Sequence, residues 1–167
     1  AGFSATFDAT LLDGANGFVL KGIDEYDRSG SSVSSAGDVN GDGFADVIVS
    51  ATLADPDGRY SAGESYVVFG TAVGFPASVD LETLDGTNGF RLDGAMANDF
   101  SGSNVSTAGD VNGDGLDDIL IAAPAADANG NLNSGETYVV FGSLNPFAAS
   151  VDLSSLYGTN GFRILVI

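Results

Sequence analysis

Short apolar runs alternate with glycine-rich polar segments along the chain. No segment long enough to form a helix places apolar residues at the 3.6-residue spacing of an amphipathic helix. Residues 46–51 form a short continuous apolar run, which is typical of a strand covered on both faces. Residues 65–69 are rich in β-branched and aromatic side chains, and residues 31–39 lead into a polar loop. Residues 89–93 alternate apolar and polar positions, so we expect a fourth, more exposed strand there.

The same pattern repeats at a constant offset, which is the spacing from Leu12 to Leu84 and again from Leu84 to Leu156. The sequence Gly-Asp-Val-Asn-Gly-Asp-Gly stands at residues 37–43 and, one such offset later, at 109–115. A regular period of this kind indicates an architecture built from repeated units.

Four short strands joined by glycine-rich turns make up one β-propeller blade, a four-stranded antiparallel sheet. The sequence therefore predicts an all-β fold with two blades. The first three strand types occur twice, at 31–70 and 103–142, whereas the fourth occurs three times, at 17–22, 89–94 and 161–165. One outer strand is therefore surplus to the two blades.

These counts divide the chain into three expected parts. Residues 1–28 hold the outer strand of a preceding blade, residues 29–94 form the first blade, and residues 95–167 form the second. Two blades cannot close a ring, because propellers have about 4 to 8 of them. Since open blade faces and unpaired strands are association sites, we expect either a piece of a longer propeller or a protomer that self-associates to complete its blades.

The charge of the chain limits the classes of partner that it can bind. Asp and Glu total 23 against 5 Lys and Arg, which gives a formal net charge of −18. Nucleic acids and anionic membrane surfaces repel such a chain, and its apolar runs are far shorter than the roughly 20 residues that span a bilayer. Cys and His are absent, which excludes disulfides, thiolate nucleophiles, His-based acid/base catalysis and the usual zinc ligand sets. Divalent cations are natural partners for this composition.

Two aspartate-rich loops, residues 38–46 and 110–118, carry oxygen-bearing side chains at loop positions 1, 3, 5 and 9. The carbonyl at position 7 adds another oxygen, and glycine at position 6 permits a sharp bend. Ca²⁺ takes about 6 to 8 oxygen ligands, whereas Mg²⁺ prefers a tighter octahedron that keeps several waters. The predicted ligands of two calcium ions, one per loop, are Asp38, Asn40, Asp42, the carbonyl of Phe44 and Asp46, and then Asp110, Asn112, Asp114, the carbonyl of Leu116 and Asp118.

An EF-hand loop opens in the same way, but it closes with a bidentate Glu at position 12 and is flanked by helices. Val49 and Ile121 stand at that position here, and each loop runs directly into an apolar strand. We therefore expect a strand–loop–strand site closed by Asp46 and Asp118. The alternative is a metal-free turn, because Asn, Asp and Gly favour turns in any case. Two calcium ions would change the formal charge from −18 to −14 and would stabilise the fold.

In these motifs the chain resembles the FG-GAP repeats of integrin-α-like β-propellers, particularly the bacterial ones. The Gly-Asp-Val-Asn-Gly-Asp-Gly-x-x-Asp loop is similar to the calcium site of that family, and Phe69-Gly70 and Phe141-Gly142 are similar to its Phe-Gly element. Residues 122–124 match its Gly-Ala-Pro element, whereas residues 50–52 and 165–167 depart from the pattern. The resemblance implies calcium-binding blades in an extracellular or cell-surface protein, with seven blades as the usual ring.

Three classes of function remain to be weighed. The first, which we favour, is a structural or adhesive module without catalysis. The second is a carbohydrate-binding, lectin-like propeller, although Trp is absent, the candidate surface tyrosines Tyr26, Tyr60 and Tyr157 are scattered, and Tyr66 and Tyr138 are expected in the core. The third is an enzyme with paired carboxylates, but the clustered aspartates are already accounted for as calcium ligands. The ligand of the module would be a protein or a glycan.

Overall fold

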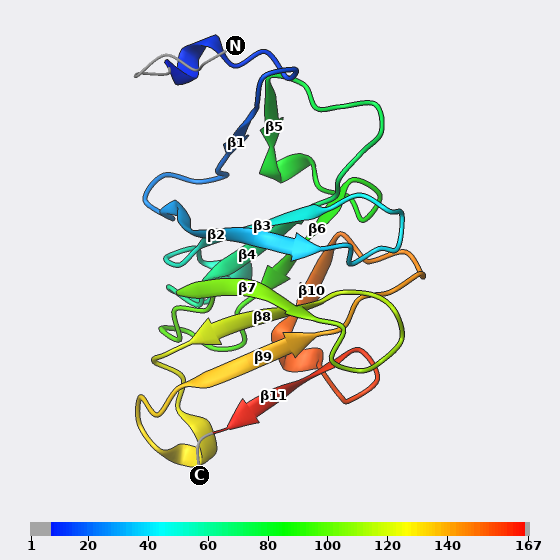
Figure 1. The fold of residues 1–167 in the computed structure, drawn as a ribbon. Coiled ribbons are helices and arrows are strands. Elements are labelled where there is room, and N and C mark those ends of the chain that lie inside the picture. The colour runs from blue at the N-terminus through cyan, green and yellow to red at the C-terminus, as the bar shows by residue number, and fades with distance from the viewer. Residues whose placement is uncertain (1–7, 166–167) are drawn as a thin grey trace.

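The computed structural model of the chain describes residues 8–165 (Figure 1). Its strands are β1 (Val19–Lys21), β2 (Ser29–Gly37), β3 (Asp46–Ala51), β4 (Glu64–Val68), β5 (Ser78–Asp80), β6 (Gly89–Asp93), β7 (Asn104–Gly109), β8 (Asp118–Ala123), β9 (Glu136–Val140), β10 (Ser150–Asp152) and β11 (Gly161–Leu165). The helical segments are single 3₁₀ turns: η1 (Ala9–Leu11), η2 (Pro56–Gly58), η3 (Leu81–Thr83), η4 (Ala128–Gly130) and η5 (Leu153–Ser155).

The predicted all-β class is confirmed, and the four predicted strand types correspond to β2, β3, β4 and β6 of the first repeat. Within residues 8–165 no helix is long and apolar enough to cross a lipid bilayer. The start of the predicted N-terminal segment, residues 1–7, lies outside the described residues, as do the last two residues of the departing segment, 166–167.

Each blade is a meander of four antiparallel strands. The first blade pairs β2 with β3, β3 with β4 and β4 with β6. The second pairs β7 with β8, β8 with β9 and β9 with β11. The two sheets lie one beside the other in Figure 1, with β2 next to β7. The sheet order therefore matches the propeller-blade prediction in both repeats.

A short parallel strand, which the sequence pattern did not predict, extends the first blade to five strands. β10 pairs with β6 in a register that places Ser150 opposite Arg91. β5 pairs with β1 in the same way, with Ser78 opposite Val19. Both members of the second pair stand one repeat earlier in the sequence than their counterparts, so the two pairs are equivalent. The surplus strand β1 therefore pairs with β5 in the same way that β6, the outer strand of the first blade, pairs with β10.

The expectation of a more exposed fourth strand is wrong for β6. Phe90 and Leu92 are 0% exposed, because β10 and the segment before it cover this strand. Phe147 of that segment stacks on Phe90 with the ring centroids 4.1 Å apart. The expectation holds for the equivalent strand β11, where Phe162 is 40% exposed and Ile164 is 51% exposed.

Two apolar clusters cover the two faces of the first blade. Ile48 of β3 lies in the cluster that the blades share, together with Ile121 of β8. The next residue of β3, Val49, lies in a second cluster, against which Leu20 of β1 and Phe75 pack. Because successive residues of β3 enter opposite clusters, this strand is covered on both faces, as its continuous apolar run predicted.

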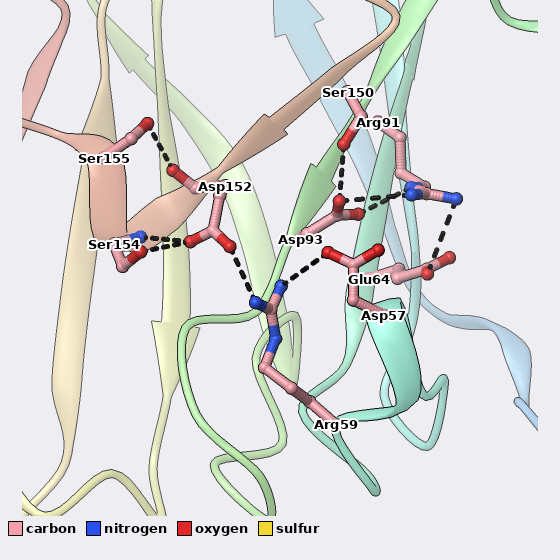
Figure 2. A network of polar contacts seen from close by, with 9 residues as sticks. All are labelled: Asp57, Arg59, Glu64, Arg91, Asp93, Ser150, Asp152, Ser154 and Ser155. Carbon is pink, nitrogen blue, oxygen red and sulfur yellow. Dashed lines mark hydrogen bonds and ion pairs between the residues drawn. The ribbon is translucent and has the colours of Figure 1, made fainter.

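A polar network fastens β10 to the first blade (Figure 2). Arg91 donates from Nε to Asp93 Oδ1 at 2.6 Å and from Nη2 to Asp93 Oδ2 at 3.1 Å. Its Nη1 lies 3.7 Å from Glu64 Oε1, and Ser150 of β10 donates its hydroxyl to Asp93 Oδ2. Figure 2 also shows Arg59, whose Nη1 binds a carboxylate oxygen of Asp152 at 2.8 Å. The contacts of Arg91 and Ser150 join β4, β6 and β10 through two buried carboxylates and a partly exposed guanidinium.

Replacing Arg91 with Ala is expected to cost about 2 kcal/mol of unfolding free energy, because Glu64 and Asp93 are then buried without a cation. Burial already raises the pKa of Glu64, although a hydrogen bond from Tyr66 and the charge of Arg91 oppose the rise. Urea unfolding of the purified variant measures the loss.

The repeat supplies a matched control for this substitution. Arg163 is the counterpart of Arg91; its side chain is 58% exposed, and its Nη1 lies 3.6 Å from Glu136 Oε1. Since exposed ion pairs contribute less than about 1 kcal/mol, Arg163→Ala should be the milder change. Equal losses for the two variants would show that burial of the pair around Arg91 does not set its strength.

Candidate metal centre

The two aspartate-rich loops occupy equivalent places, because each connects the first two strands of its blade. Residues 38–46 join β2 to β3, and residues 110–118 join β7 to β8. Gly41 and Gly43 have φ angles of 72° and 88°, in the left-handed region that a Cβ disfavours. Their counterparts in the second loop have φ angles of 80° and 90°. Glycine therefore stands where each loop reverses its direction.

Asp38 organises the turn of the first loop. Its Oδ1 accepts the N–H of Asp42 at 3.1 Å, and its Oδ2 accepts the N–H of Gly43 at 2.9 Å. Asn40 Oδ1 also accepts the Asp42 N–H, at 3.0 Å, and Asp42 Oδ1 accepts the N–H of Phe44 at 2.9 Å. These bonds bring the side chains of the first three predicted ligands together around one short turn.

The second loop is built in the same way. Asp110 accepts the N–H of Asp114 at 3.0 Å and the N–H of Gly115 at 2.9 Å. Asn112 accepts the Asp114 N–H at 2.8 Å, and Asp114 accepts the N–H of Leu116 at 2.9 Å. Each of these bonds has a counterpart of closely similar length in the first loop. The same scaffold is thus present twice.

The last acid of each loop lies at its base and is buried. Asp46 is 1% exposed; its Oδ2 accepts the N–H of Val39 at 2.9 Å, and its Oδ1 accepts the N–H of Gly70 at 2.8 Å. Asp118 makes the two equivalent bonds, both at 2.9 Å. Each carboxylate therefore ties its loop to the Phe-Gly turn that follows the third strand of the blade.

Negative charge gathers at the first loop. Burial raises the pKa of Asp46 to about 6, the two backbone N–H donors lower it, and the nearby carboxylates of Asp42 and Asp38 raise it again. A carboxylate that is buried near two other carboxylates is stabilised by a positive charge. The electrostatics of this loop therefore favour a cation.

The donor set of each loop fits a hard cation. Three carboxylates, one amide and one backbone carbonyl are the oxygen donors that Ca²⁺ takes in proteins, and a carboxylate oxygen that accepts one N–H keeps a second lone pair. No group of three or more acidic side chains in residues 8–165 is arranged as a metal cluster by itself. Amide and carbonyl oxygens would have to join the carboxylates for either loop to hold a cation.

The tyrosines lie where the sequence placed them. Tyr66 and Tyr138 are each 1% exposed, whereas Tyr26, Tyr60 and Tyr157 are 86%, 67% and 75% exposed. The two buried hydroxyls donate to the glutamate two residues earlier in the same strand. The exposed rings come from three separate segments of the chain, which gives the lectin-like alternative no added support.

Sequence reasoning missed Asp117, which precedes the last acid of the second loop. Its Oδ2 accepts the N–H of Asp38 at 2.9 Å, and its own N–H donates to the Asp38 carbonyl at 3.2 Å. The counterpart of Asp117 in the first loop is Ala45. A charged residue in only one of two otherwise similar loops was the signal that could have identified it.

The model of the FG-GAP repeat family matches residues 29–68 and 101–140. These ranges contain both loops and the first three strands of each blade. The chain carries two FG-GAP repeats. The predicted family resemblance is therefore confirmed for both copies.

Similar proteins extend this result. The chain is 34% identical over 118 residues to the phosphatidylinositol-glycan-specific phospholipase D of Bos taurus. The aligned region covers 71% of this chain and 14% of that protein. The chain is 32% identical over 139 residues to integrin alpha-PS2 of Drosophila melanogaster (80% and 9%) and 30% identical over 132 residues to integrin alpha pat-2 of Caenorhabditis elegans (79% and 10%). The chain thus spans only a small part of the length of each of these relatives. Its two FG-GAP repeats make it a β-propeller-type repeat module, as in integrin alpha chains.

Proposed function

We propose that each FG-GAP loop binds one Ca²⁺ and that the chain is a calcium-stabilised, non-enzymatic module with a structural or adhesive role. The observation that carries this proposal is the double occurrence of one hydrogen-bonded scaffold, with the same oxygen-bearing residues at each ligand position. A single loop of this kind is explained by turn formation alone. Two loops that preserve every donor are better explained by a shared ligand.

The chain's own residues have distinct parts in this proposal. Asp38, Asn40 and Asp42 present oxygens around the turn, the carbonyl of Phe44 adds another, and Asp46 anchors the loop at its base; the second loop repeats the arrangement. A bound calcium ion supplies positive charge that offsets the repulsion among the carboxylates. Since a formed loop exists only in the folded chain, binding stabilises the fold.

A role without catalysis agrees with the matched regions. The carboxylates of the loops accept backbone hydrogen bonds and are the proposed cation ligands, so they are not free as an acid/base pair. The integrin alpha chains among the relatives support an adhesive role in an extracellular or cell-surface protein. The match to the phospholipase D covers only 14% of that protein, so it does not support an enzyme here.

Further blades are expected to cover the outer face of the second blade. Phe162 and Ile164 are 40% and 51% exposed, whereas their counterparts Phe90 and Leu92 are 0% exposed because segments of the second repeat cover them. Within residues 8–165, β1 pairs with β5 alone. We therefore propose that neighbouring blades, from a longer chain or from a second copy, complete the assembly.

Calorimetric titration of the chelator-treated chain tests the proposal. We expect saturable calcium binding that a matched magnesium titration does not reproduce at the same concentrations, because Mg²⁺ requires a tighter octahedron and gives up its bound waters reluctantly. Light scattering on the same samples gives the mass, and a mass above that of one chain supports completion by a second copy. A chain that takes up no calcium would contradict the proposed function.

A further inference from the structure

The first loop is held by the second blade as well as by its own strands. Asp117 brackets Asp38, since its Oδ2 accepts the Asp38 N–H at 2.9 Å and its own N–H donates to the Asp38 carbonyl at 3.2 Å. The carbonyl of the next residue, Val39, accepts the N–H of Ser143 at 2.8 Å. The backbone that carries the first predicted ligand is thus fixed from the neighbouring repeat.

The second loop lacks this support within residues 8–165. A Cβ at Gly37 would lie 2.3 Å from Asp117 Oδ2, and a Cβ at Gly41 would lie 2.5 Å from Leu144. At their counterparts, Gly109 and Gly113, no described atom lies within 4 Å of the same position, leaving out chain neighbours. The two loops therefore share an internal scaffold and differ in what packs against them.

We propose that Asp117 is a positioning residue for the cation site of loop 38–46, and that the two sites of the chain are unequal for this reason. The inference rests on the proposed calcium binding. Both hydrogen bonds between Asp117 and Asp38 are made with the backbone of Asp38, so Asp117 fixes the peptide groups of that residue. A loop that is already ordered loses less conformational freedom on binding, so the first loop should bind calcium more tightly than the second.

Loss of the hydrogen bond that the backbone N–H of Asp38 donates to the Asp117 carboxylate should weaken calcium binding at the first loop about tenfold, which corresponds to about 1.4 kcal/mol. The second loop should keep its affinity, because Ala45 at the same position shows that the loop forms with alanine there. The coupling thus runs from the second blade to the first loop.

Calorimetric calcium titrations of single-loop backgrounds test this proposal. Asp114→Ala disables the second loop and reports the first; adding Asp117→Ala should weaken its binding about tenfold. Adding Asp117→Asn instead should restore the affinity to within about threefold, because the amide oxygen still accepts the Asp38 N–H. Asp42→Ala reports the second loop, and adding Asp117→Ala there should change nothing. Amide hydrogen exchange at Asp38 in chelator should be faster in the Asp117→Ala chain.

The outcomes separate this proposal from the one on which it rests. Unchanged binding at both loops in the Asp117→Ala variants would overturn the positioning role and leave the calcium sites intact. Equal weakening at both loops would also overturn it, since it would indicate a general loss of stability. Absence of calcium binding by the unmodified chain would contradict the proposed function and this inference together.

Discussion

Calcium at about one hundred times its dissociation constant is expected to raise the melting temperature by roughly 10–20 °C above that of chelator-treated protein. Each occupied site adds about 2.7 kcal/mol at that concentration, and there are two such loops. The ions also reduce the repulsion in a chain with a formal net charge of −18. Calorimetric or circular-dichroism melts in calcium and in excess chelator measure the difference.

The control for this result is a variant that loses one exposed aspartate from each loop and keeps the buried aspartate at the base of each loop. Asp42 and Asp114 are exposed, whereas Asp46 and Asp118 are buried. A double variant with Asp42→Ala and Asp114→Ala should melt at the same temperature with and without calcium. If this variant responds to calcium as the unmodified chain does, the stabilising ions bind elsewhere.

Asp46→Ala is expected to cost about 3 kcal/mol of unfolding free energy even in chelator, because one buried and one part-buried backbone donor lose their acceptor. Its carboxylate accepts the N–H groups of Val39 and Gly70 while 1% exposed. Each unsatisfied donor costs about 1–3 kcal/mol, and removal of the buried Asp46 carboxylate offsets part of this loss because that charge no longer has to be buried. Urea unfolding in chelator measures this loss apart from any calcium effect.

Asp42→Ala is the matched comparison in the same loop. Asp42 is exposed and bonds within the turn, to Phe44 N–H and Asn40 Nδ2. Its replacement should cost less than about 1 kcal/mol in chelator and should remove the calcium response of its loop. If Asp42→Ala and Asp46→Ala lower the stability of the chelated protein equally, the account of Asp46 as the structural anchor is wrong.

The four predicted strand types, which are β2, β3, β4 and β6 in the first repeat, and both loops could be predicted because their signals lie in the local sequence. The apolar run of β3, the β-branched run of β4 and the loop motif recur at a fixed offset, and repetition removes the ambiguity of each short segment. Local glycine and aspartate positions also set the hydrogen bonds of the turns. The scaffold of the candidate site was therefore accessible from the sequence alone.

The burial of β6 and the strand β10 could not be predicted in the same way. A strand as short as β10 carries no usable alternation, although the segments at 78–81 and 150–153 share the sequence Ser-Val-Asp-Leu. The covering of Phe90 by Phe147 is a contact between distant segments, which period and propensity do not report. The alternating pattern of β6 therefore predicts an exposed face, but the segment that contains Phe147 covers that face in the folded chain.

The contact between the loops escaped prediction for a related reason. Repetition draws attention to what the two copies share, whereas Asp117 matters because Ala45 stands in its place in the other copy. Which atoms it meets depends on how neighbouring blades are rotated against each other. Differences between repeats identify such residues once the packing of the blades is known.

Native mass spectrometry counts the calcium ions that the folded chain binds. In calcium the unmodified chain should carry two ions, the Asp42→Ala and Asp114→Ala variants one each, and the double variant none. The chelated chain and a chain in magnesium at equal concentration are the controls. A chain that carries no calcium, or a double variant that still carries two ions, would contradict the assignment of a calcium site to each FG-GAP loop.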